Sequence, residues 1–302
     1  MEELSEMHCG IAVEGTTYNL CCYADDLLLC SLTISGLQKL IDAADAYING
    51  HGLSFNPQKT VCVTFGKSSF NNRQWYLQGS KLQEATEVKH LGVILSNDTR
   101  RHADSRIQAA RRAFYSLQGA GLCVNGCNPS TIAQLYTTAV RPVLSYGLEC
   151  ISLCDTVMKD VVKTQSKFLK AALGVKSRCR SSPLLQALKI CDLRSHVEWQ
   201  KMSLYRNVFT SSSRTKTLYK MFLTRALQGR LPSHANLTSS VLKICHKNNI
   251  SLVKFICDKV YKSKCKTLMK SRPECGLADS VRFCLFSSPK DDVMLNNLLS
   301  SY

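Results

Sequence analysis

The chain has 302 residues, of which 39 are Lys or Arg and 22 are Asp or Glu, giving a net charge of +17. Its hydrophobic fraction of 45% can bury a core, which excludes wholesale disorder. No apolar run approaches the ~20 residues that a membrane-spanning helix needs, and the acidic opening segment lacks the features of a signal peptide. We therefore expect an intracellular protein of the cytoplasm or nucleus, neither secreted nor membrane-bound, whose 16 cysteines stay reduced.

Charge is unevenly distributed along the chain. Residues 1–100 carry 7 basic and 11 acidic residues, a net charge of −4. Residues 101–302 carry the other 32 basic and 11 acidic residues, a net charge of +21. This excess indicates that the second part faces a polyanion. Nucleic acid is favoured over an anionic membrane surface, because no long helix pairs a basic face with Trp and Phe.

The first hundred residues predict short strands and one helix. Apolar runs flank Ala24, Asp25 and Asp26, which is typical of a hairpin with carboxylates at its tip. Apolar residues at helical spacing over 35–48 predict a helix that ends near Gly50. Strands are expected at 20–23, at 27–32, on both sides of a turn at 56–58, at 75–77 and at 88–95. This part is therefore expected to be α+β with antiparallel strands.

Beyond residue 100 the apolar residues recur every three or four positions, which predicts helices. The first stripe runs from Ala103 to Leu117. The second helix is expected to be capped by Ser130 or Thr131 and kinked at Pro142. A third helix before Gly174 completes a small bundle. Further helices are expected at 184–190, at 196–209 and within the basic segment 243–270, with linkers at 210–213 and 229–232.

The segment Tyr23-Ala24-Asp25-Asp26 is the clearest candidate for chemistry. A turn is usually satisfied by one Asp or Asn with Gly, so two adjacent acids between apolar strands are unusual. Two carboxylates at a hairpin tip can bind Mg²⁺, which prefers oxygen ligands and leaves room for substrate phosphates. Paired metal ions can then stabilise an in-line phosphoryl transfer. Taken alone, such a tetrapeptide is more often a solvated acidic turn.

Several segments in their order along the chain resemble the reverse transcriptase palm of non-LTR (LINE-type) retrotransposons. The YADD tetrapeptide is followed by an amphipathic helix, then by G-L-S-F-N-P-Q-K-T at 52–60, then by H-L-G-V-I-L at 90–95. Segments 141–149 and 165–170 resemble the thumb of that family. The resemblance covers about residues 9–210 and depends on the order and spacing of the segments. It implies a partial palm at 1–100, a helical thumb at 101–175 and a basic helical C-terminal region at 176–302.

The resemblance also implies roles for individual residues in RNA-templated DNA synthesis. Asp25 would bind catalytic Mg²⁺ directly, assisted by Asp26. Lys59 would lie near the triphosphate of an incoming dNTP and act as a general acid on departing pyrophosphate. Leu91 and Gly92 would support the primer end as a primer grip. Without the resemblance, Lys59 is better explained as a surface lysine, and residues 91 and 92 as part of a core strand.

Basic residues on two predicted helices form a candidate contact with an RNA or DNA template–primer. Four lysines spaced by four, four and three residues would line one face of the third helix. Three arginines lie on the first helix. The candidate residues are Arg106, Arg111, Arg112, Lys159, Lys163, Lys167 and Lys170, extended by Lys176, Arg178 and Arg180. Binding through such a surface would weaken steeply with salt. An ordinary solvated helix face is the alternative.

Two further sequence features bear on the chemistry. Related polymerases have another metal-binding Asp and the fingers upstream of YADD, whereas only 22 residues precede Tyr23 here. We therefore expect a truncated polymerase that is inactive in isolation; the alternatives are a non-catalytic nucleic-acid-binding protein and a decayed retroelement relic. The cysteine pairs at 123/127 and 150/154 lack zinc-finger spacing and are interpreted as small core residues.

Overall fold

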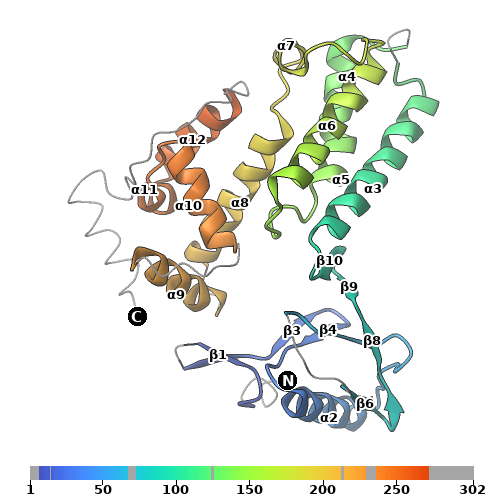
Figure 1. The fold of residues 1–302 in the computed structure, drawn as a ribbon, viewed down its shortest axis with the longest axis vertical. Helices are drawn as coiled ribbons and strands as arrows, with labels where there is room; N and C mark the ends of the chain where they lie inside the picture. The colour runs from blue at the N-terminus through green and yellow to red at the C-terminus, as the bar shows by residue number, and fades with distance from the viewer. Residues whose placement is uncertain are drawn as a thin grey trace. The chain divides into compact units, whose positions relative to one another are not determined.

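The computed structural model describes residues 7–13, 15–66, 73–123, 126–211, 214–228 and 236–271. The chain divides into two compact units, Met1–Asp98 and Thr99–Tyr302. The first unit holds short strands and one helix, and the second is helical (Figure 1). This order agrees with the expected α+β part followed by helices. The described residues include no helix that is long and apolar enough to cross a membrane.

Short strand pairs dominate the first unit. Its described elements are β1 (Ile11–Val13), β2 (Thr16–Tyr18), β3 (Leu20–Tyr23), β4 (Asp26–Leu29), α2 (Ile34–Gly50), β5 (Val61–Val63), β6 (Tyr76–Leu77), β7 (Ser80–Lys81), β8 (Gln83–Ala85), β9 (Glu87–His90) and β10 (Val93–Ser96). Antiparallel pairs join β1 to β2, β3 to β4, β6 to β7 and β9 to β10. The β3–β4 hairpin confirms the prediction of a hairpin around Asp25 and Asp26.

Helix α2 provides much of the buried surface of the first unit. The Thr33 side chain accepts a hydrogen bond from the Gly36 N–H, which satisfies one of the free donors at the helix start. Ile41 on α2 belongs to a buried cluster with Trp75 and Leu77. The indole N–H of Trp75 donates to the Ile34 carbonyl over 3.3 Å, so the same ring also fixes the first turn of the helix.

Two strand predictions in this unit are wrong. No strand precedes the turn at 56–58, and β5 instead pairs in parallel with β8. A parallel pair needs a long connection, and here the chain between β5 and β8 supplies it with the β6–β7 hairpin. The single strand expected at 88–95 is the β9–β10 hairpin, because Leu91 and Gly92 both have positive φ and turn the chain back.

The second unit consists of helices. They are α3 (Arg100–Gly119), α4 (Pro129–Leu135), the π-helix η1 (Tyr136–Val140), α5 (Arg141–Ser145), α6 (Asp155–Ala172), α7 (Ser181–Ala187), α8 (Leu193–Thr210), α9 (Thr215–Leu227), α10 (Leu237–Lys247), α11 (Leu252–Cys257) and α12 (Lys259–Ser271). The expected first and third helices correspond to α3 and α6. The expected 229–232 linker, and residues 212 and 213 of the expected 210–213 linker, lie outside the described residues.

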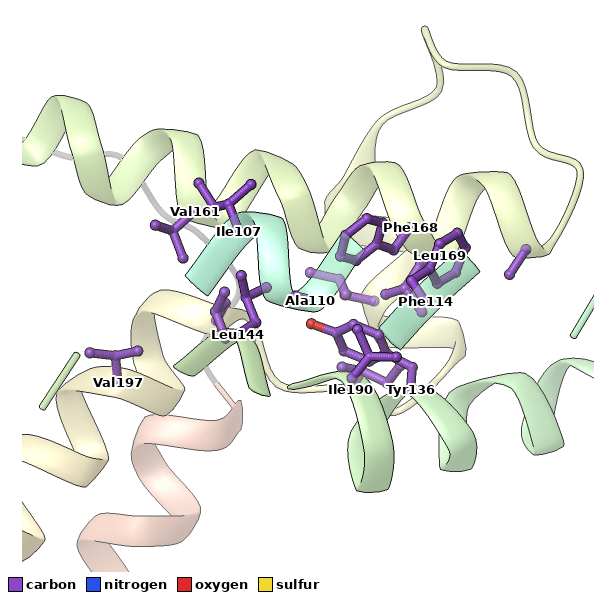
Figure 2. Close-up of a cluster of buried hydrophobic side chains, with 14 of the residues drawn as sticks. Ile107, Ala110, Phe114, Tyr136, Leu144, Val161, Phe168, Leu169, Ile190 and Val197 are labelled. Atoms are coloured by element: carbon purple, nitrogen blue, oxygen red, sulfur yellow. The ribbon is translucent and has the colours of Figure 1, made fainter. Parts of the chain in front are cut away.

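One core joins α3, α4–α5 and α6. Phe114 of α3 stacks on Phe168 of α6 with ring centroids 4.5 Å apart, and Ile107 lies beside Val161 in the same cluster (Figure 2). Tyr136 from η1 is also fully buried there. Burying each of these large side chains stabilises the fold by roughly 1.5–3 kcal/mol. The apolar stripes predicted on α3 and α6 are therefore the faces that pack together.

The second helix of this bundle differs in detail from its prediction. Its cap is Asn128, whose side chain accepts from the Thr131 N–H, and not Ser130 or Thr131. The bend expected at Pro142 takes the form of the π-helical turn η1 immediately before it. Proline has no N–H to donate to the Thr138 carbonyl, so the helical ladder is interrupted at this point. The N–H of Arg141 bonds to the Tyr136 carbonyl, five residues back.

Helix α8 extends from this core into a second buried cluster. Its early residues, such as Val197, pack in the first cluster, and its later residues, Met202 and Tyr205, pack with α9–α12. The basic segment predicted as one or two amphipathic helices thus forms parts of three, α10 to α12, whose apolar faces share this core. Cys150 and Cys154 are exposed, so their interpretation as core residues is wrong.

Candidate functional site

The β3–β4 hairpin presents the two acidic residues. Tyr23 pairs with Asp26 across the strands, leaving Ala24 and Asp25 as a two-residue turn. Ala24 has φ of +52°, and in a two-residue turn a positive φ at the first position alone is typical of type II′. Both carboxylates and the Tyr23 ring, which is 64% exposed, face solvent. The turn therefore holds two consecutive acidic residues, Asp25 and Asp26, in exposed positions.

The turn places an unfavourable residue at a special backbone position. Glycine adopts positive φ without steric cost, whereas the Cβ of Ala24 meets a carbonyl oxygen there, at a cost of roughly 1–2 kcal/mol. Local strain of this kind is concentrated at functional sites, where the surrounding structure maintains it. At this turn the strain is maintained by the four residue pairs that join β3 to β4, from Leu20–Leu29 to Tyr23–Asp26.

The acidic turn supplies only part of a metal site. Among the described residues, no group of three or more His, Cys, Asp or Glu side chains comes together. Two carboxylates can bind a divalent cation that keeps water or substrate phosphates as its other ligands. Asp25 and Asp26 thus fit one side of such a site. A catalytic metal pair needs additional carboxylate oxygens to hold the second ion.

Lys59 lies in a turn organised by Asn56. The Asn56 carbonyl accepts from the N–H groups of Lys59 and Thr60, and its side-chain oxygen accepts from the Gln58 N–H at 2.9 Å. Pro57 suits the second position of this turn. The Lys59 side chain is exposed. In the described part of the chain, no hydrogen bond or ion pair links its ammonium to Asp25 or Asp26.

Leu91 and Gly92 form the tip of the β9–β10 hairpin. Their φ values are +48° and +79°, and positive φ at both central residues is the signature of a type I′ turn. Leu91 is 40% exposed, although Asn or Gly is the usual residue at its position. The predicted primer grip is therefore a strained hairpin tip that projects an apolar side chain, and not a core strand.

Helices α3 and α6 carry exposed basic residues beyond an ion pair that joins the two helices. An ion pair of 3.4 Å joins Arg100 to Asp160, and the Phe114–Phe168 stack lies further along both helices, which therefore run in parallel. Arg111 follows Arg100 by three turns, and Lys167 follows Asp160 by two. Both residues are exposed. The helical repeat therefore places these two cations on the faces of α3 and α6 that carry the Arg100–Asp160 ion pair, here called the seam.

The other predicted cations differ in their availability. Lys159 and Lys163 are exposed, with Lys163 also 3.5 Å from Asp160. Arg106 is partly buried, with its guanidinium 5.8 Å from the centre of the Tyr146 ring. Such a cation–π contact holds the charge against the protein. The Lys170 ammonium donates to two backbone carbonyls and is only partly exposed.

Sequence reasoning missed Tyr115 as a candidate contact. It is 62% exposed on α3, one turn after Arg111 and Arg112, which are also exposed. Residues three and four apart on a helix are neighbours on its surface. An exposed aromatic ring between cations can stack on an unpaired base while the cations bind phosphates. The signal was present in the sequence, because Tyr115 falls outside the apolar stripe that ends with Phe114 and Leu117.

One comparison with known proteins finds a similarity, and it concerns the first unit. Residues 2–95 match the family model for reverse transcriptase (RNA-dependent DNA polymerase). That match contains the Asp25–Asp26 turn, Lys59 and the Leu91–Gly92 turn, and it ends before α3 begins. No curated protein and no solved structure matches the chain. Most of the first unit is thus similar to the reverse transcriptase family, and the match does not extend into the helical unit.

Proposed function

We propose that this chain is the carboxy-terminal part of a reverse transcriptase from a non-LTR (LINE-type) retrotransposon. Residues 1–100 would be part of its palm and residues 101–175 its thumb, followed by a basic helical region. The observation that carries this proposal is the exposed Asp25–Asp26 hairpin tip inside the reverse transcriptase match. A seam of cations on the helices that follow supports it, because a template–primer presents phosphates to such a surface.

The roles of the site residues follow from their chemistry. Asp25 and Asp26 would hold Mg²⁺, which supplies charge stabilisation to nucleotidyl transfer when it is bound. Lys59 would place its ammonium beside the negative charge of the dNTP triphosphate. Leu91 and Gly92 would position the primer end by apolar and backbone contact. Because the described residues provide one side of a metal site, we propose that the 302-residue chain alone does not extend primers.

Primer extension tests the catalytic part of the proposal. The purified chain is given a labelled DNA primer on an RNA template, all four dNTPs and Mg²⁺, and product length is followed over time. We expect no extension above a protein-free control. Mg²⁺-dependent extension that Asp25→Ala removes would refute the inactivity and confirm Asp25 as catalytic. Extension that survives Asp25→Ala would refute the assignment of the site.

Binding of the same hybrid tests the nucleic-acid part. Fluorescence anisotropy at several salt concentrations gives the slope of log K against log salt, whose magnitude is about 0.9 for each phosphate that the protein neutralises. Replacing Arg111 and Lys167 by Met should lower the magnitude of this slope by about 2, because two cations no longer neutralise phosphates. A control, Lys264→Met, removes one exposed charge from α12. Salt-dependent binding without extension would also fit a non-catalytic binding protein, and an in-frame sequence upstream of Met1 that encodes fingers would favour the polymerase fragment.

A further inference from the structure

The chain between Asp160 and Asp192 is unusually basic. It contains no acidic residue and seven cations: Lys163, Lys167, Lys170, Lys176, Arg178, Arg180 and Lys189. Three of the seven lie within five residues in the connection between α6 and α7. A connecting segment with such a local charge would repel itself unless something fixes its backbone. The structure shows what does so.

The segment begins with a tight reversal at the end of α6. Gly174 has φ of +64°, and the Val175 N–H bonds to the Lys170 carbonyl at 2.9 Å, as in a Schellman-type helix end. A second turn follows, in which the Cys179 N–H bonds to the Lys176 carbonyl at 3.0 Å. The backbone of residues 174–180, here named the α6–α7 loop, is therefore folded into two successive turns.

The Lys170 side chain ties this loop to the helix. Its ammonium donates to the Ser177 carbonyl at 3.0 Å and to the Cys179 carbonyl at 2.5 Å. Each bond has a charged donor, which makes it stronger than a bond between neutral groups. A cation is also favoured in the last turn of a helix, where carbonyls lack partners. The partly exposed Lys170 thus bonds to the protein's own backbone, whereas Lys176, Arg178 and Arg180 of the loop are exposed.

We propose that the α6–α7 loop is a phosphate-binding element for the template–primer backbone and that Lys170 is its positioning residue. This inference rests on the proposed function and adds a loop whose shape is set before binding. A loop that is already ordered loses less conformational entropy when it binds, so its three cations contribute more to affinity. Phosphate contacts of this kind position the duplex without reading its sequence.

A coupled set of variants tests the role of Lys170. The first is Lys176→Ala/Arg178→Ala/Arg180→Ala, the second Lys170→Met, and the third combines them; all are compared in the RNA–DNA anisotropy assay. The triple variant should lower the salt slope by about 2.7, because three cations no longer neutralise phosphates. Lys170→Met should weaken binding about tenfold in the wild-type loop and less than twofold in the triple variant.

Two measurements separate positioning from direct contact. Without nucleic acid, Lys170→Met should speed amide hydrogen exchange within residues 175–180, an effect that a lysine contacting only phosphate would not have. Lys170→Arg keeps the charge and donors and should restore both exchange and affinity. Lys264→Met, which removes one exposed charge from α12, should change affinity less than twofold. If Lys170→Met does not fold, Lys170→Gln replaces it.

The outcomes distinguish the inference from the proposed function. If the wild-type chain does not bind the hybrid, the proposed function itself fails. If it binds and the triple variant keeps the full salt slope, the loop is not a phosphate site. Equal losses of affinity from Lys170→Met in both loop backgrounds would make Lys170 a direct contact and overturn its positioning role. Preference for anionic lipid vesicles over the hybrid would assign the loop to membranes and also overturn the inference.

Discussion

Lys201 gives the sharpest test of the packing in the helical unit, because its charged side chain is buried next to apolar residues. It lies on α8 with 7% of its surface exposed, where the two buried clusters meet, and its ammonium donates to the Ile151 carbonyl at 2.7 Å. Burial lowers its pKa, and the nearby Glu198, Cys150 and Glu149 only partly offset this effect. We therefore expect the charged form to destabilise the fold and Lys201→Met to remove that cost.

The direction of the pH dependence follows from the lowered pKa. Between the folded and unfolded pKa values of Lys201, the unfolded chain holds more protons, so the free energy of unfolding rises with pH. The rise approaches 1.4 kcal/mol per pH unit and ends near pH 10.4, where the unfolded lysine also loses its proton. Lys201→Met should lack this rise. At pH 7 it loses one charge-assisted hydrogen bond, of about 1.5–3 kcal/mol, but it also avoids the burial of a charge, which costs several kcal/mol.

Urea unfolding followed by circular dichroism at pH 7 and pH 10 measures both effects. We expect Lys201→Met to equal or exceed the wild type in stability at pH 7. At pH 10 it should be about 1 kcal/mol less stable, because the neutral amine of the wild type still donates to Ile151. Lys247→Met is the matched control, since Lys247 lies 3.3 Å from the same Glu198 carboxylate but is exposed. A loss of stability above 2 kcal/mol at both pH values would refute the reasoning.

Three further predictions concern the core, a thiol and a hairpin. Phe168→Ala should destabilise the helical unit by about 3–5 kcal/mol, because its ring stacks on Phe114 in the core; a denaturant midpoint that scarcely moves would contradict this. Burial, and secondarily the nearby Cys265, raises the pKa of Cys245 from 9.0 to about 12, so its contribution to stability is complete below pH 9 and is lost as pH rises towards 12. At pH 11 the loss of stability is at most about 2.7 kcal/mol. The midpoint temperature of thermal unfolding should therefore fall less between pH 8 and 11 in Cys245→Ala than in the wild type; equal falls would refute the assignment. Leu91→Asn should stabilise the β9–β10 hairpin by about 1 kcal/mol, since Asn adopts positive φ more readily, and slow its amide exchange several-fold; faster exchange would show that the leucine side chain holds the tip.

Local sequence patterns were sufficient to predict the hairpin and the helix faces around the candidate site residues. Apolar strands on both sides of Asp25 and Asp26 predicted the hairpin, because alternation and turn residues act over a few positions. The apolar stripes of α3 and α6 predicted their buried faces, since a helix repeats every 3.6 residues wherever it packs. In both cases the information lies within the segment itself.

Errors arose where a structure depends on residues far apart in the chain. The parallel pairing of β5 with β8 depends on a strand partner that lies beyond the next hairpin, which no local pattern identifies. At residues 88–95 the apolar run concealed a turn, because Leu91 adopts a backbone conformation that leucine rarely occupies.

The fate of each charged side chain was likewise decided by tertiary structure. Lys167 and Lys170 belong to the same row in sequence, yet the first is exposed at the seam with α3 and the second donates to the α6–α7 loop. Lys201 looks like any other lysine on a helix, and packing against the segment around Ile151 buries it. By itself the sequence determined where cations and carboxylates are concentrated. Only the folded chain decided which of them reach solvent, because exposure depends on what packs against a helix and not on the helix alone.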